Sequence, residues 1–230
     1  MSHVNGMKVR VDMSQIDAEA VVNRMQKHFK PHPWHGIKAT VDGSNELVNA
    51  FIEIVPSDSV KYEVDKATGY LMVDRPQKFS NVMPCLYGFV PQTYCGDHVA
   101  AHAMQKLSRT GIKGDGDPID ICVLTDADIN QGDLLLHARP IGGFRMIDDG
   151  EADDKIIAVL KDDPVYEQWN DVSECPQKVI DRMKHYFLTY KQIPGAGQKI
   201  EVEIAAIYGR EEALQVLEKS RLDYAENFAD

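Results

Sequence analysis

Apolar residues gather in short stretches along the middle of the chain, and polar turns separate these stretches. Alternating apolar and polar residues, or four to eight apolar residues between turn residues, are typical of β-strands. A hairpin is expected over residues 61–75, because Lys66-Ala-Thr-Gly69 divides two such stretches. The predicted strands cover residues 47–55, 61–75, 87–90, 120–124, 134–141, 156–160 and 200–208.

Three other stretches repeat apolar residues at helical spacing. Two lie near the C-terminus, over residues 176–191 and 211–228. The third begins at Ser14, which forms an S-x-x-D capping pattern with Asp17, and ends near Phe29. Many short strands followed by helices predict an α+β fold built on a small antiparallel β-barrel.

Length and composition fit one globular domain. Of 230 residues, 43% are hydrophobic and 27% are charged, which is ordinary for a folded protein. The formal net charge of -11 argues against a nucleic-acid partner, because such binding relies on cations that neutralise phosphates. No apolar run approaches the roughly 20 residues that cross a bilayer, and the N-terminus lacks the apolar core of a signal peptide. We therefore expect a cytoplasmic protein without a membrane partner.

The most informative segment is an acidic loop. Asp115, Asp117 and Asp120 lie within six residues, and Gly116 and Pro118 between them favour a sharp, rigid turn. Two unit charges about 4 Å apart repel by roughly 4 kcal/mol at an effective dielectric constant of 20. The cluster therefore needs a proton or a cation, and carboxylate oxygens favour magnesium, manganese or calcium.

Three other interpretations of this loop are weaker or remain open. A solvated acidic turn is common for an isolated D-G-D. An EF-hand requires glycine at the sixth position of its loop, and counting from Asp115 that position holds Asp120. A phospho-aspartyl hydrolase places its D-x-D directly after an apolar strand, whereas here the apolar run follows the loop.

A second acidic segment covers residues 148–154, just before a predicted strand. Alone it is typical of a surface loop. Together with the first cluster, it offers enough oxygen ligands for several metal ions. Two ions about 3.5–4 Å apart can hold both the attacking and the leaving oxygen of a phosphoryl transfer.

Candidate phosphate-binding side chains occur elsewhere in the chain. Lys61 and Glu63 lie two positions apart on a predicted strand and so share a face. Arg75 ends the next strand, and Tyr190 and Lys191 end a predicted helix. Each of these taken singly is typical of a surface position, and it is their combination with the acids that indicates a phosphate site.

At these residues the chain resembles the soluble family I inorganic pyrophosphatases. The D-G-D-P-x-D signature of that family is intact at residues 115–120, and the resemblance extends over residues 51–208. The other matching segments are 53–56, 61–65, 73–75, 84–89, 139–142, 146–148, 153–155 and 185–191.

The resemblance implies an OB-like β-barrel flanked by helices. It also implies hydrolysis of pyrophosphate to two orthophosphates with several Mg²⁺ ions, for which Mn²⁺ could substitute, by direct attack of a metal-activated water. Asp117 would be the general base. The implied metal-site residues are Asp115, Asp120, Asp148, Asp153 and Glu53. The implied substrate-site residues are Lys61, Glu63, Arg75, Tyr87, Lys155, Tyr190 and Lys191.

The chain departs from this pattern in three places. The interval from Glu53 to Lys61 is one residue shorter than we expect for the family. Residues 1–45 form an N-terminal extension, and residues 91–114 form a lengthened loop, within one domain that spans residues 1–230. The loop contains Cys95-x-x-His98-x-x-x-His102, for which we weigh a soft-metal site against a surface extension and favour the extension.

Two rival functions remain. One is a metal-dependent hydrolase of other small polyphosphates or nucleotides, although the chain lacks a glycine-rich nucleotide loop. The other is a calcium-binding module, which does not explain the matched lysines, arginine and tyrosines. We further expect a homo-oligomer.

Overall fold

The computed structural model of the chain describes residues 17, 20, 21, 24, 28–44, 46–191 and 201–228. It divides into two units, Met1–Pro31 and His32–Asp230. In the first unit, the Ala20 N–H donates to Asp17 Oδ1 at 3.1 Å, so that Asp17 caps a helical turn. The cap predicted at Ser14 lies outside the described residues.

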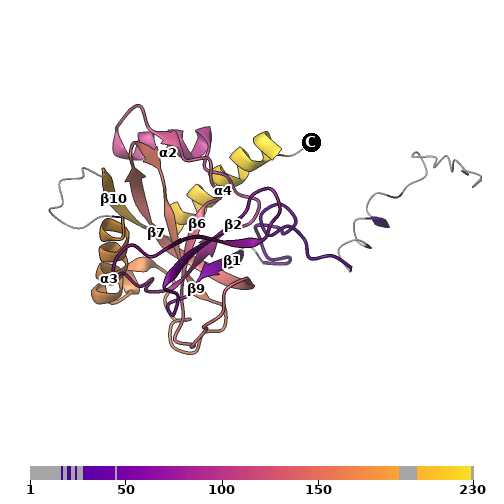
Figure 1. The fold of residues 1–230 in the computed structure, drawn as a ribbon. Helices are drawn as coiled ribbons and strands as arrows, with labels where there is room; N and C mark the ends of the chain where they lie inside the picture. Colours follow the sequence, from indigo (N-terminus) through magenta and orange to yellow (C-terminus); the bar gives the residue numbers. More distant parts are fainter. Residues whose placement is uncertain are drawn as a thin grey trace, which may run out of the picture. The chain divides into compact units, whose positions relative to one another are not determined.

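Five strands of the second unit close into a barrel (Figure 1). They follow the order β1 (Val48–Ile54), β4 (Leu86–Phe89), β6 (Asp120–Leu124), β9 (Lys155–Leu160) and β7 (Leu134–Asp148), and β7 pairs back to β1. This confirms the predicted small barrel, with one difference: β6 and β9 run parallel. Both are almost wholly buried apolar runs, as is typical of parallel strands.

Strand β7 is longer than the predicted strand, which was expected to end at Ile141. It continues through Gly142 and Gly143 to Asp148. The glycines are required by close packing, because a Cβ on Gly143 would lie 2.5 Å from the Tyr208 ring. Tyr208 belongs to β10 (Val202–Gly209), which pairs with this second half of β7.

Two short strands and a separate hairpin complete the β-structure. The end of β7 also pairs with β8 (Glu151–Ala152), and β8 pairs with β5 (Lys113–Gly114). The predicted hairpin is confirmed as β2 (Val60–Val64) and β3 (Leu71–Pro76), a two-stranded sheet of its own. Its turn contains Gly69 at a φ of 74°, which favours glycine.

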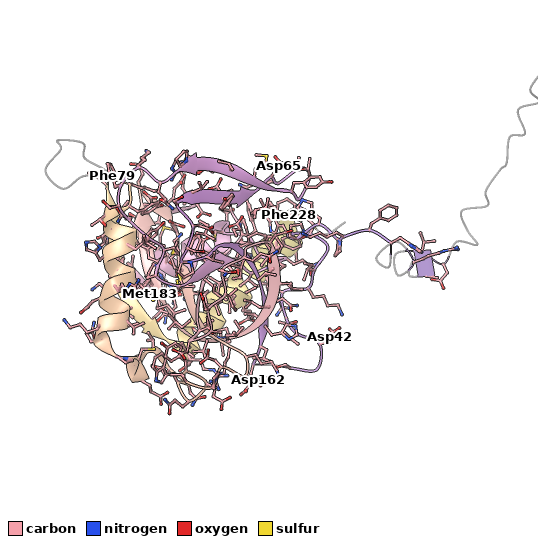
Figure 2. All side chains as sticks on the ribbon, turned by 60° about the horizontal axis from the view of Figure 1, so that its bottom comes forward. Asp42, Asp65, Phe79, Asp162, Met183 and Phe228 are labelled. Carbon is pink, nitrogen blue, oxygen red and sulfur yellow. The ribbon has the colours of Figure 1, made fainter. Side chains whose placement is uncertain are left out.

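The two C-terminal helices agree with their predicted positions. They are α3 (Gln177–Thr189) and α4 (Arg210–Phe228), and a short 3₁₀ helix, η2 (Val172–Glu174), precedes α3. Met183 is fully buried on the side of α3 that faces the barrel (Figure 2). Among the described helices, none has the length and apolar character needed to span a bilayer.

The segment of residues 91–114, which we predicted as a lengthened loop, contains a helix. This helix, α2 (Asp97–Leu107), packs against α4 (Figure 1). Gly96, which precedes the helix, has no side chain to cap it. The backbone N–H groups of Gly96, His98 and Val99 instead donate to Asp223 of α4. A helix capped by a distant residue leaves little local signal in the sequence.

Candidate active site

A cavity of about 300 Å³ brings together twelve of the thirteen site residues predicted from the sequence. We call it the acidic cavity. It lies where the acidic loop, β1, the β2–β3 hairpin and the end of α3 meet. The predicted residues that line it are Glu53, Lys61, Glu63, Tyr87, Asp115, Asp117, Asp120, Asp148, Asp153, Lys155, Tyr190 and Lys191.

The acidic loop is held by its own turn and by the segment before α2. Gly116 adopts a φ of 77°, and the Asp117 N–H donates to Asp115 Oδ1 at 2.9 Å. The Cys95 N–H donates to the Asp117 carbonyl at 2.8 Å, and the Gly116 N–H donates to the Cys95 carbonyl at 3.1 Å. These bonds fix the backbone of the loop from which the three carboxylates extend.

Asp120 and Asp153 converge on one ammonium group. Lys155 Nζ contacts both carboxylates, and the Tyr87 hydroxyl donates to Asp120 Oδ2 at 2.6 Å. The parallel pairing of β6 and β9 explains this, because it places Asp120 directly beside Lys155. Burial lowers the pKa of Lys155, but Asp120 and Asp153 outweigh that effect and raise it well above its usual value. The lysine therefore remains charged.

Asp115 is a strongly perturbed carboxyl group of the loop. Burial, together with the nearby charge of Asp153, raises its pKa to about 9. The single ammonium of Lys155 therefore leaves the carboxylates short of positive charge. A cation among them would restore Asp115 to its ionised form.

Glu53 enters the cavity from β1, although its spacing from Lys61 in the sequence is short. Its side chain is only 7% exposed, and Oε1 accepts the Val64 N–H at 2.6 Å. Burial raises its pKa to about 8, and the Val64 hydrogen bond partly offsets that effect. The β2–β3 hairpin therefore contacts β1 through this carboxylate and brings Lys61 and Glu63 to the same cavity.

The cavity lysines are paired with acids. Lys61 contacts Glu63 and lies 3.2 Å from Asp74, and Lys191 contacts Asp148. Arg75 is the one predicted site residue that does not line the cavity. It pairs with Asp74 on β3, although its backbone lies opposite Lys61.

Some cavity residues had no role in our sequence interpretation, and Lys66 and Trp34 are the most prominent. Lys66 Nζ contacts the Asp117 carboxylate and lies 6.0 Å from the centre of the Trp34 ring. The Trp34 indole N–H donates to the Thr93 carbonyl at 2.8 Å, and the Thr93 hydroxyl accepts the Ile119 N–H. Lys66 follows the matched Lys61–Asp65 segment, but Trp34 lies in the N-terminal extension, where no motif marks it.

Cys95, His98 and His102 do not form a joint metal site. Cys95 is buried beside the acidic loop, whereas His98 Nε2 lies 2.9 Å from Glu226. His102 points toward Glu212, 3.7 Å away. Among the described residues, possible ligand atoms of His98, Asp223 and Glu226 lie within 4.8 Å of one another, but Asp223 already accepts three backbone N–H groups.

Comparison with known proteins gives a consistent result. The family model described as "Inorganic pyrophosphatase" matches residues 50–225. The chain is 55% identical over 200 residues to the inorganic pyrophosphatase of Chlamydia muridarum, with 86% of this chain and 95% of that one covered. It is 36% identical over 203 residues to the soluble inorganic pyrophosphatase of Oryza sativa subsp. japonica, which covers 88% of this chain and 84% of that one. A solved structure from Helicobacter pylori, titled an inorganic pyrophosphatase, is 32% identical at a TM-score of 0.65 and covers 82% of this chain and 99% of its own.

Proposed function

The chain belongs to the inorganic pyrophosphatase family, and from this premise we propose that the acidic cavity is its active site. The protein is an inorganic diphosphatase that hydrolyses pyrophosphate. The observation that carries the assignment of the site is the convergence of twelve predicted residues on one cavity. These residues come from segments spread between Glu53 and Lys191, so that only folding brings them together.

The residues present fit a divalent metal ion. Burial and Asp153 raise the pKa of Asp115 to about 9, and this supports a cation among the carboxylates of the cavity. Hard oxygen donors of this kind suit Mg²⁺, with Mn²⁺ as a substitute. We propose that Asp115, Asp120 and Asp153 hold one ion. Asp148 would share a further ion with Asp153, and Glu53 would act through water. When bound, the ions neutralise phosphate charge and make water more acidic.

The lysines and tyrosines are proposed to bind the phosphate groups. Lys61 and Lys191 hold their positions through Glu63, Asp74 and Asp148, and each ammonium borders the cavity. Tyr87, Tyr190 and Lys155 line the same space. Ammonium and hydroxyl donors in a partly buried site form strong, charge-assisted hydrogen bonds to phosphate oxygens.

Arg75 is also proposed to bind phosphate, because a planar guanidinium can bind two phosphate oxygens at once. It can do so only if its side chain turns away from Asp74 toward the cavity. Glu63 is proposed to hold the Lys61 ammonium in place.

Asp117 is proposed to take the proton from the attacking water. Its backbone is fixed through both Cys95 and Asp115, whereas its side chain is half exposed at the cavity. Direct in-line attack of water needs no covalent enzyme intermediate, and a half-exposed carboxylate at the cavity suits the role of its base.

The experiment is to measure phosphate release by the purified protein from pyrophosphate with Mg²⁺. Parallel reactions would use ATP with Mg²⁺, and pyrophosphate with Ca²⁺. We expect rapid release only from pyrophosphate with Mg²⁺. Faster release from ATP would favour the nucleotide-hydrolase alternative, and no release from any mixture would overturn the proposed function.

The extent of the catalytic domain and the assembly state complete the proposal. The match to the family over residues 50–225 falls within the unit His32–Asp230, which supports this unit as the catalytic domain. We propose a cytoplasmic protein that assembles as a homo-oligomer. Sedimentation velocity of the purified protein tests the oligomer.

A further inference from the structure

Three consecutive residues at the edge of the acidic cavity point in opposite directions. Asp153 and Lys155 line the cavity, whereas Asp154 between them is 1% exposed and does not line it. Residues 153 and 154 belong to no strand, and the Asp153 N–H donates to the Met146 carbonyl at 3.0 Å. The orientation of this segment therefore depends strongly on what holds the Asp154 side chain.

Asp154 is held by a buried arginine and a tyrosine. Arg145 Nε lies 3.2 and 3.0 Å from the two carboxylate oxygens, and Nη2 lies 3.0 Å from Oδ2. The Tyr208 hydroxyl donates to Oδ2 at 3.1 Å, and its ring centre lies 5.1 Å from the guanidinium carbon. Arg145 is itself only 1% exposed. Nε donates to both carboxylate oxygens, whereas Nη2 makes no hydrogen bond, and this charge-assisted contact fixes the direction of the Asp154 side chain.

The same arginine connects to the helices outside the barrel. Arg145 Nη1 lies 3.2 Å from Glu212 at the start of α4, and Lys106 of α2 lies 3.3 Å from that carboxylate. His102 of α2 approaches Glu212 to 3.7 Å. Both helices thus contact the buried pair through Glu212.

We propose that Arg145, Asp154 and Tyr208 are positioning residues, which orient Asp153 and Lys155 toward the acidic cavity and so set its affinity for a divalent metal ion. The inference rests on the proposed role of Asp153 in metal binding. None of the three residues touches the cavity, so that they act only through their neighbours. Side chains that orient metal ligands in this way typically change metal affinity about 10- to 100-fold when they are replaced.

The central test is the double variant Arg145→Met with Asp154→Leu. Removing both partners leaves no unpaired buried charge, whereas either single change would leave one. Mg²⁺ titrated alone into the protein, followed by calorimetry, gives the affinity, and circular dichroism with thermal unfolding reports the fold. We expect a folded protein whose Mg²⁺ affinity is about 10- to 100-fold weaker. Unchanged affinity in a folded double variant would overturn the inference.

Two milder variants keep the test decisive if the double variant fails to fold. Tyr208→Phe removes one hydrogen bond to Asp154, and we expect a weakening of about 2- to 10-fold. Arg145→Lys keeps the charge but loses the planar contact. Its Mg²⁺ affinity should lie between that of the parent protein and that of the double variant. Parent-like Mg²⁺ affinity in both variants would contradict the inference.

Two controls separate this inference from the proposed function. Asp163 is as buried as Asp154 and accepts bonds from Thr125, Asp126, Val165 and Tyr166, but it does not line the cavity. Asp163→Asn should lower the unfolding temperature without changing Mg²⁺ affinity, and a similar loss of affinity there would contradict a specific role for Asp154. Asp153→Asn should weaken Mg²⁺ binding. If it does not, the proposed metal site is wrong and the inference fails with it. If it does while the double variant binds normally, the inference alone fails.

Discussion

Neighbouring carboxylates of the acidic loop lie in different surroundings, and this difference separates their proposed roles. Asp115 and Asp120 face the crowded group around Lys155, where burial raises the pKa of both. The Asp117 side chain is about half exposed and contacts Lys66 instead. Side chains buried among other acids suit a metal ion, whereas an exposed one can exchange protons with water.

The first prediction concerns Asp117→Asn. The amide keeps the size of the side chain and the backbone bonds to Cys95, so that the loop should stay in place. Loss of a general base should lower kcat about 10²- to 10⁴-fold. Stopped assays of phosphate release give kcat, and calorimetry with Mg²⁺ alone should show nearly unchanged affinity.

Asp120→Ala is the matched variant. It should weaken Mg²⁺ binding itself, because Asp120 lies among the acids that we propose as ligands. Full turnover in Asp117→Asn would contradict the role of Asp117 as the general base. Unchanged Mg²⁺ affinity in Asp120→Ala would contradict the role of Asp120 as a ligand of the ion.

Most of the candidate site could be predicted at this scale, because its acids and lysines occur in short, spaced motifs. Trp34 and Lys66 could not. Their relevance comes from contacts with Thr93 and Asp117, which lie 59 and 51 positions away, and no local pattern records such contacts. Arg75 shows the converse, because a matched motif did not settle where its side chain points.

At the scale of elements, continuous apolar strands and strongly periodic helices were predictable, and elements that depend on distant partners were not. Helix α2 receives its N-terminal cap from Asp223, more than 120 positions away. Strand β7 passes through Gly142 and Gly143, and glycine within a strand often marks a bulge or the close approach of another segment. Tyr208 approaches both glycines and Val172 approaches Gly142, so that a Cβ at either position would clash.

The second prediction concerns two histidines of α2 with opposite pH behaviour. The hydrogen bond that His98 donates to Glu226 raises the pKa of His98, so that its stabilising effect is full below pH 6.5 and is lost as the pH rises through the raised value. Burial and Arg145 lower the pKa of His102, so that this residue reduces stability as the pH falls below 6.5. His98→Gln should therefore lower the unfolding temperature, relative to the parent protein, by more at pH 6 than at pH 8.

His102→Gln should show the opposite trend. Its unfolding temperature relative to the parent protein should be higher at pH 6 than at pH 8. Thermal unfolding of the three proteins at both pH values gives the comparison. If the unfolding temperature relative to the parent changed with pH in the same direction in both variants, the local surroundings of the two histidines would not set their effects on stability.

The third prediction concerns how much of the N-terminus the catalytic unit needs. The acidic cavity lies entirely within the unit that begins at His32. We expect a chain of residues 32–230 to keep the unfolding free energy and turnover of the full chain. A chain of residues 46–230 lacks Trp34, which packs with Phe51 and Phe89, and should lose about 3–5 kcal/mol or more.

Urea unfolding of both truncated chains measures these differences. Trp34→Ala in the full chain is the control, because it removes only the indole. It should reproduce most of the loss seen in the shorter chain, and a shorter chain as stable as the longer one would contradict the packing role of Trp34.

The fourth prediction concerns the effect of Mg²⁺ on the stability of the whole molecule, whose net charge is -11. A ligand that binds only the folded state adds about 2.7 kcal/mol of stability when its concentration is 100 times Kd. Mg²⁺ at that level should therefore raise the unfolding temperature, and a chelator should reverse the rise. Asp120→Ala should reduce the shift, and NaCl at matched ionic strength should not reproduce it.

Strand β7 also has a consequence for the folding of the chain during synthesis. The barrel closes by pairing β1 with β7, whose partners lie about 80 to 90 positions apart. Contacts this distant form slowly, because a long loop must be ordered before they contribute stability. Glu53 comes from β1 and Asp148 from β7, on opposite sides of this closure. A nascent chain therefore leaves the ribosome with Glu53 and Asp148 apart, and it can acquire catalytic competence only after β7 and the later segment to Lys191 have emerged.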